Sequence, residues 1–161
     1  MRSAIRSVLE SNTKYALALV GGVDEVQMIA QPVAGVTMNH PAWVLSHLNV
    51  YAPIATAALR RDAFEDPAGH RYGRKSRVVN DAGEYMGKDA LVAEYERIHR
   101  ETLAALASAD DGVFSEATPL ARWREANPTI GALMVMLLVK HESIHLGQLS
   151  AWRRAMGLPP V

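Results

Sequence analysis

The segment KHESIHLGQLSAW, residues 140–152, contains the string H-E-x-x-H. A helix turns by about 100° per residue, so His141 and His145 lie about 40° apart on neighbouring turns of one face. The same face continues at spacings of three and four residues through side chains that are mostly apolar, namely Met134, Leu138, Gln148 and Trp152. We therefore expect both imidazoles to point inward, where they can meet on one metal ion.

Two buried imidazoles need partners, because each unsatisfied polar nitrogen costs about 1–3 kcal/mol. A metal ion removes that cost but requires a third protein ligand. A zinc peptidase takes this ligand from downstream of H-E-x-x-H, and the chain after His145 contains no Asp, Glu, His or Cys. The third ligand must come from upstream, and His47 is the best candidate because Trp43 and Tyr51 share its inward stripe. The sequence predicts His47, His141 and His145 as metal ligands.

The other polar residues near these motifs leave alternatives open. Glu142 is rotated about 100° from His141, so it is either a general base at the rim of the site or a glutamate that is exposed or contacts another helix. His40 is either a helix cap or a group that faces the substrate, and we place Trp43, Tyr51 and Gln148 around the pocket. His70 and His99 are expected to be solvated and without a role. The alternative for the histidine pair itself is an ordinary set of core or surface histidines.

Composition limits the classes of function. The 17 basic and 17 acidic residues balance, so no positive field favours nucleic acid as a partner. The absence of cysteine excludes disulfides, cysteine ligands and a protein thiol nucleophile. Charged residues interrupt the N-terminal segment, and the longest apolar run, residues 130–139, is shorter than the roughly 20 residues of a membrane span. We expect a cytoplasmic protein that is not bound to a membrane.

Helical periodicity predicts an all-α four-helix bundle in a single domain over residues 1–161. The expected helices and the short helical piece after the first of them cover residues 2–20, 24–30, 41–60, 89–108 and, from an Asn-Pro-Thr start at 127–129, up to 156. Pro53 predicts a bend in the second long helix. The charged connection at residues 61–87 is long for a compact domain, which indicates a lid or an arm that packs on a partner.

Two segments together resemble the DinB-like superfamily: NHPAWVLSHLNVY at residues 39–51 and KHESIHLGQLSAWRRAMGLPP at residues 140–160. The resemblance implies a four-helix bundle that binds a metal through one histidine of the second helix and the H-x-x-x-H pair of the last. By position these ligands fall on His47, His141 and His145. Characterised relatives include metal-dependent transferases and isomerases that use low-molecular-weight thiols, and many members have no known activity.

Three functions follow from the sequence and this resemblance. The first is a metal-dependent transferase or isomerase acting on a small molecule, with the thiol as a cosubstrate because the chain has no cysteine. The second is a metal-stabilised dimeric stress protein without turnover, and the third is an H-E-x-x-H metallohydrolase. Zinc or nickel is the expected ion, with iron or manganese as alternatives. The cluster Arg71, Arg74, Lys75 and Arg77 either recognises the carboxylate of the thiol or is a solvated loop. An apolar surface nearly all round the second helix predicts a homodimer.

Overall fold

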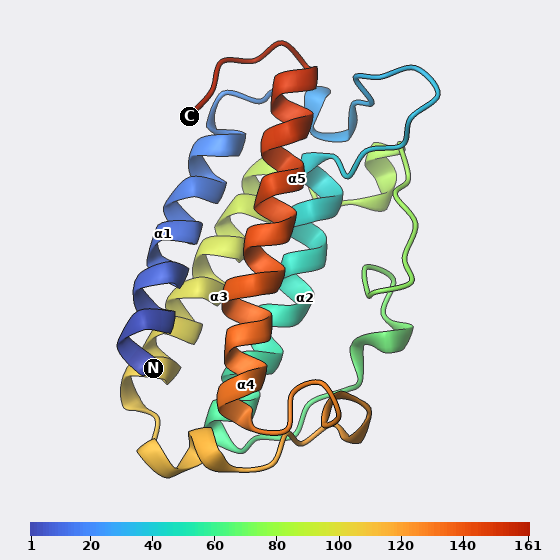
Figure 1. The fold of residues 1–161 in the computed structure, drawn as a ribbon. Helices are drawn as coiled ribbons and strands as arrows, with labels where there is room; N and C mark the ends of the chain where they lie inside the picture. The colour runs from blue at the N-terminus through green and yellow to red at the C-terminus, as the bar shows by residue number, and fades with distance from the viewer.

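The computed structural model describes residues 1–161 and contains long helices joined by connections, without a β-sheet. Figure 1 shows the bundle that these helices form. Its elements are α1 (Arg2–Gly21), α2 (Pro41–Arg60), α3 (Lys88–Ser108) and a last long helix made of α4 (Ile130–Met134), a π-helical segment (Val135–His141) and α5 (Glu142–Ala155). The expected all-α four-helix architecture is confirmed.

The ends of α2 follow from local capping chemistry. The backbone N–H of Trp43 donates to Nδ1 of His40 at 3.2 Å, and Pro41 occupies the first helical position, where its missing N–H costs nothing. The helix continues through Pro53 to Arg60 without interruption. Arg61 then adopts a left-handed conformation with a φ of 61°, which ends the helix.

Two predicted helix boundaries differ from the observed ones. The piece expected at residues 24–30 is a single 3-10 turn, Gln27–Ile29. The last helix begins at Ile130, two residues later than the proline signal suggested, because the hydroxyl of Thr129 accepts the N–H of Ala132. Pro128 precedes the helix, and its carbonyl accepts the N–H of Thr118.

Helices α2 and α3 run in the same direction, and this explains the long connection at residues 61–87. Figure 1 shows this segment returning along the side of the bundle from the end of α2 to the start of α3. A helix of 20 residues is about 30 Å long, so a chain that starts a parallel neighbour must cover that distance again. Two 3-10 turns, Pro67–Gly69 and Ala82–Glu84, interrupt an otherwise irregular path.

The core consists of two apolar clusters stacked along the bundle. One cluster joins the start of α1 and the second half of α2 to the end of α3 and to α4, with Leu9 and Leu133 fully buried. The other joins the end of α1 and the first half of α2 to the start of α3 and to α5, with Tyr95 and Trp152 fully buried. His47 comes from the middle of α2, where the two clusters meet.

The π-helical segment changes which residues of the last helix face the core. Its i→i+5 hydrogen bonds accommodate one extra residue, so the buried stripe passes from Leu138 to Glu142 and Leu146 instead of to His141. Glu142 is only 2% exposed. His141 is shifted to the edge of the helix that faces α2. The uniform turn of 100° per residue that we assumed for the sequence missed this shift.

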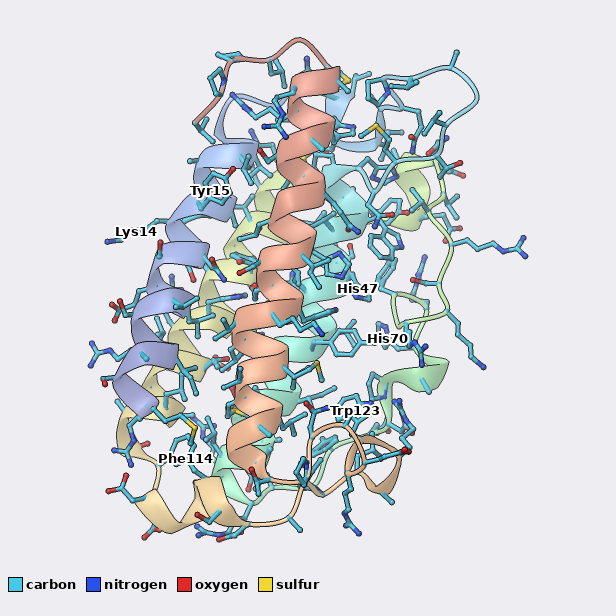
Figure 2. The ribbon with its side chains drawn as sticks, viewed as in Figure 1. Lys14, Tyr15, His47, His70, Phe114 and Trp123 are labelled. Atoms are coloured by element: carbon cyan, nitrogen blue, oxygen red, sulfur yellow. The ribbon has the colours of Figure 1, made fainter.

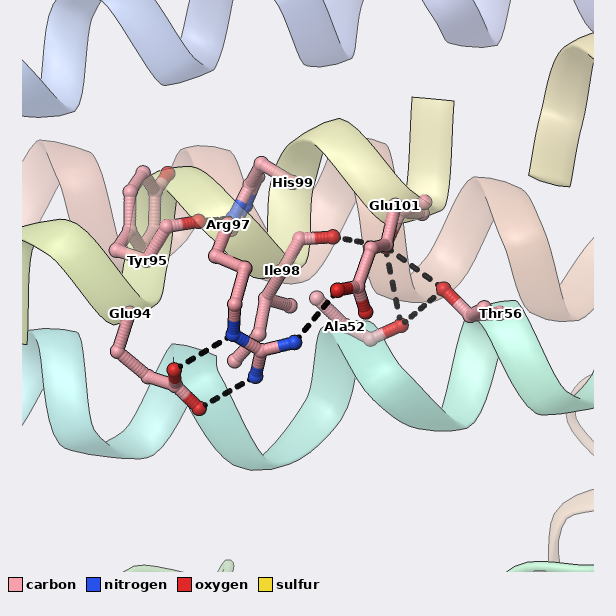
Figure 3. Close-up of polar contacts among 9 residues, drawn as sticks. Ala52, Thr56, Glu94, Tyr95, Arg97, Ile98, His99 and Glu101 are labelled. Atoms are coloured by element: carbon pink, nitrogen blue, oxygen red, sulfur yellow. Dashed lines mark hydrogen bonds and ion pairs between the residues drawn. The ribbon is translucent and has the colours of Figure 1, made fainter. Parts of the chain in front are cut away.

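Helix α3 separates an exposed charged face from a buried one. Arg97 lies on the exposed face and pairs with Glu94 and Glu101, as Figure 3 shows. His99 lies on the buried face with no exposed surface, so the prediction that it is solvated was wrong. The hydroxyls of Thr56 and Thr102 share a hydrogen bond of 2.9 Å that joins α2 to α3.

Two further observations bear on partners. By length and composition alone, the helix Ile130–Ala155 passes a test for a membrane span, but half of its most apolar window is buried in the bundle, and core helices pass the same test. Fifteen of the 20 residues of α2 are buried within one chain. The apolar surface of α2 is therefore covered by the protein itself, and the predicted homodimer rests on no free surface of this helix.

Candidate metal centre

The three predicted histidines meet at one point between α2 and the last helix. His141 ends the π-helical segment and His145 follows one turn later in α5. Nε2 of His141 lies 3.0 Å from Nε2 of His47 and 3.1 Å from Nε2 of His145. All three side chains offer a ligand atom within 4.8 Å of the others. Figure 2 places the labelled His47 on α2, on the side that faces α5.

Backbone and side-chain carbonyls orient two of the three rings. Nδ1 of His47 lies 2.6 Å from the carbonyl oxygen of Tyr72, and Nδ1 of His145 lies 2.9 Å from Oε1 of Gln148. Both oxygens can only accept, so each Nδ1 carries the hydrogen and each Nε2 keeps its lone pair. Nδ1 of His141 is buried without a partner, so the protein does not fix the tautomer of this ring.

This arrangement fits a cation. The lone pairs on Nε2 of His47 and of His145 both point at Nε2 of His141, which can carry only one hydrogen. At least one nitrogen pair about 3 Å apart is therefore left with two lone pairs facing each other. An ion that accepts all three lone pairs removes this repulsion, and three neutral imidazoles with an open position form a catalytic type of metal shell.

Burial keeps the imidazoles neutral. Desolvation is the largest cause that lowers the pKa of His47 to about 4 and that of His141 to about 3, and the neighbouring histidines lower both further. Desolvation also lowers the pKa of His145, partly offset by the hydrogen bond to Gln148. Neutral imidazole is the form that binds a metal, so the three rings are ready as ligands at neutral pH.

A cavity of about 360 Å³ opens beside the three histidines. Trp43 stacks on His47 with ring centroids 4.6 Å apart and 14° between the planes. The ring of Tyr51 lies 4.7 Å from that of His141 and 4.8 Å from that of His47. The remaining lining residues are Arg74, Arg122, Trp123, Met136 and Leu137. The volume is at the small end of ligand pockets, so it suits a small molecule and not an extended peptide.

Comparison with the sequence profiles of known protein families gave a match for this chain. The profile of the DinB superfamily matches residues 9–149, which include α2, the connection at 61–87 and all three histidines. The chain belongs to the DinB superfamily. The comparison with curated proteins gave no match. Membership agrees with the resemblance seen in the sequence and leaves the substrate open.

In this DinB-superfamily chain the predicted pocket residues divide into two groups. Trp43 and Tyr51 line the cavity. Gln148 is outside the lining, but it orients His145 and is itself held by Asn39, whose Nδ2 donates to Oε1 of Gln148 at 2.8 Å. His40 has no exposed surface, caps α2 and hydrogen-bonds the carbonyl of Val79 at 3.0 Å, so it is a structural residue.

Glu142 lies away from the cavity of this DinB-superfamily protein. Its Oε1 accepts from the hydroxyl of Tyr95 at 2.9 Å and is 2.5 Å from Nε2 of His99. Nδ1 of His99 in turn lies 2.8 Å from the carbonyl oxygen of Tyr95. These three residues form a buried network between α3 and α5. The position gives Glu142 no route to act as a general base on a ligand in the cavity, so the structure supports the alternative in which it contacts another helix.

Sequence reasoning missed one side of the DinB-superfamily cavity. Of the four basic residues singled out at 71–77, only Arg74 lines it, while Arg71 pairs with Glu84 and stacks on Tyr72. Arg122 and Trp123 come from the connection before the last helix, where no periodicity or motif points to them. His70 is exposed, as expected.

Proposed function

We propose that the protein is a metal-dependent transferase or isomerase that binds a divalent ion through His47, His141 and His145 and acts on a small molecule with a low-molecular-weight thiol. The convergence of three Nε2 atoms in one cavity wall supports this function best. A divalent ion at this point would polarise a bound oxygen or lower the pKa of a bound water or thiol.

The residues around the site support turnover as well as binding. The carbonyl of Tyr72 and Oε1 of Gln148 hold two of the ligand rings in place, which limits the reorganisation needed on binding. Trp43 and Tyr51 pack against the histidine rings, and the cavity that they help to line has an open side. Because the chain contains no cysteine, any thiol in the reaction must enter through this open side.

The choice of ion and the oligomeric state are part of the proposal. Three neutral imidazoles suit zinc or nickel, and iron or manganese remain alternatives. A homodimer in solution is proposed from the sequence alone, and analytical ultracentrifugation tests it. The metallohydrolase alternative loses its general base, because Glu142 is engaged with Tyr95 and His99 in the core.

The first experiment measures the metal content of protein purified without an affinity tag, beside the variants His47→Ala and His141→Ala. We expect a near-stoichiometric divalent metal in the native protein and its loss in both variants. Titration of the cobalt-loaded protein with 2-mercaptoethanol, followed by its visible absorption, then tests access of a thiol. A metal that persists in His47→Ala would remove α2 from the site and overturn the proposed centre.

A metal that only stabilises the bundle gives a different result. It would be retained and would raise the melting temperature, but the cobalt spectrum would not respond to any thiol. That outcome would favour the non-catalytic stress protein over the transferase or isomerase.

A further inference from the structure

The lining of the cavity beside the histidines carries two guanidinium groups and no carboxylate. Arg74 comes from the connection at 61–87, and Arg122 comes from the 3-10 turn Ala121–Trp123. The rest of the wall is aromatic or aliphatic. A divalent ion on the histidines would add further positive charge to this small space. An uncharged or cationic ligand would leave the charge of Arg74, which has no ion pair, uncompensated.

Arg122 is held in a fixed orientation. Its Nε donates to Oδ2 of Asp66 at 2.8 Å, its Nη2 donates to Oδ1 of the same carboxylate, and its guanidinium lies 4.9 Å from the ring centroid of Trp123. These hydrogen bonds from Arg122 lower the pKa of Asp66 to about 2, so the carboxylate that holds Arg122 stays ionised. The Nη1 group makes no hydrogen bond within the protein. It remains available to a ligand in the cavity.

Arg74 has no partner for its charge. Its guanidinium makes no ion pair and no hydrogen bond in the structure, in contrast to Arg71, Arg97 and Arg122, which all pair with carboxylates. Both arginines line the same small cavity as the three histidines. Guanidinium groups bind carboxylates through paired N–H groups, so this side of the cavity is chemically complementary to such a ligand.

We propose that the molecule bound beside the histidines carries a carboxylate that Arg74 and Arg122 receive, while its reacting end faces the metal centre. This inference rests on the proposed function only for the reacting end. The carboxylate site itself is built from side chains that are present with or without an ion. The aromatic walls add contact with the apolar part of the ligand.

Two thiols that differ only at the far end test the proposal: 3-mercaptopropionate and its neutral amide, 3-mercaptopropionamide. Binding is followed by tryptophan fluorescence, since Trp43 and Trp123 line the cavity, in both metal-free and cobalt-loaded protein. We expect the carboxylate to bind roughly tenfold or more tightly than the amide, which corresponds to one charge-assisted interaction. Arg74→Gln and Arg122→Gln should remove this preference.

Arg77→Gln is the matched control, because Arg77 is in the same connection, is exposed and does not line the cavity. It should keep the full preference. Arg74→Gln carries no risk to folding, since Arg74 holds no other residue in place, and its melting temperature should equal that of the native protein. An equal affinity for the two thiols, or a preference that survives in Arg74→Gln and Arg122→Gln, would overturn the carboxylate site.

Two further outcomes distinguish a failure of the proposed metal centre from a failure of the proposed carboxylate site. If the protein binds no metal but the metal-free form still prefers 3-mercaptopropionate, the metal centre is wrong and the carboxylate site stands. If metal binds and the preference is absent, the centre stands and the carboxylate site is wrong. Acetate should displace 3-mercaptopropionate more effectively than inorganic phosphate does at the same concentration, and equal displacement would contradict a site for carboxylates in particular.

Discussion

Two adjacent residues of the last helix, His141 and Glu142, belong to two polar clusters with opposite properties. His141 faces His47 and His145. Nε2 of His47 and of His145 are acceptors, and Nε2 of His141 between them can carry one hydrogen at most. Glu142 faces His99 and Tyr95, where donors and acceptors alternate. Both clusters are largely buried. The first needs an ion to be satisfied, whereas in the second both ring nitrogens of His99 and the hydroxyl of Tyr95 have an oxygen partner within the protein.

The difference shows that burial alone does not identify a metal ligand. His99 is more deeply buried than any of the three proposed ligands, yet each of its ring nitrogens faces an oxygen acceptor. What distinguishes the metal centre is the convergence of lone pairs from rings whose other nitrogen is already engaged.

The largest expected effect comes from removing one ligand. His141→Ala should lower metal affinity by more than about a hundredfold, since even residues that only orient a ligand account for 10–100-fold. His99→Ala should keep the metal, because His99 lies on α3 and contacts Glu142 instead of the three ligand histidines. Metal analysis after dialysis checks both variants. Equal loss from the two would erase the distinction between the clusters.

The second effect concerns folding stability. Glu142→Ala leaves the hydroxyl of Tyr95 and Nε2 of His99 without a partner in the core, which should cost about 3–5 kcal/mol. Urea unfolding followed by circular dichroism measures this loss. The control is Glu101→Ala, which breaks an exposed pair with Arg97 and should cost less than about 1 kcal/mol. Similar losses in the two variants would contradict a buried network.

The third effect is a pH dependence to which the ligand cluster contributes. In metal-free protein the folded pKa values of His47 and His141 are about 4 and about 3, below the value of 6.5 in an unfolded chain. The unfolded state therefore binds more protons below pH 6.5, and stability is complete above that pH and falls as pH decreases toward 4. The slope is about 1.4 kcal/mol per pH unit for each histidine.

Urea unfolding in the presence of a chelator, at several pH values across this window, measures the slope. The double variant His47→Ala, His141→Ala should show a shallower dependence than the native protein, since it lacks the two depressed groups. A native slope equal to that of the double variant would mean that these rings are protonated in the folded state.

The smallest effect comes from the side chain that orients His145. Gln148→Ala should weaken metal binding by roughly tenfold through loss of the hydrogen bond to Nδ1. Asn39→Ala, which removes only the donor that holds Gln148, should have a smaller effect. Competition with a chelating dye measures the metal affinity of each variant and distinguishes the two effects. An unchanged affinity in Gln148→Ala would show that the ring of His145 is positioned by packing alone.

Much of the fold could be predicted because its signals are local. Pro41 with a capping residue before it sets the start of α2, and periodicity in the last helix brings His141 and His145 to one side. The inward stripe on the second helix selected His47, and the family resemblance gave the same position. These features depend on the spacing of residues along one helix, and this spacing can be read directly from the sequence.

The placements of Glu142, His99 and Arg122 could not be predicted from residue spacing along one helix. The π-helical segment rotates the last helix by one residue, and this turned Glu142 into a core residue instead of a rim residue. The burial of His99 follows from its pairing with Glu142 across two helices. Arg122 reaches the cavity through an irregular connection, where no periodicity applies. Each of these placements is set by contacts between segments that are distant in the sequence.

The parallel course of α2 and α3 and the late position of the histidine pair also determine when the site can form in the cell. His47 and His141 are 94 residues apart in the chain. At the usual pace of translation, a growing chain would carry His47 for on the order of ten seconds before the other two ligands are made. During that interval the chain presents a single imidazole, which holds transition metals weakly. Selection of the ion is thus deferred until the last helix has docked.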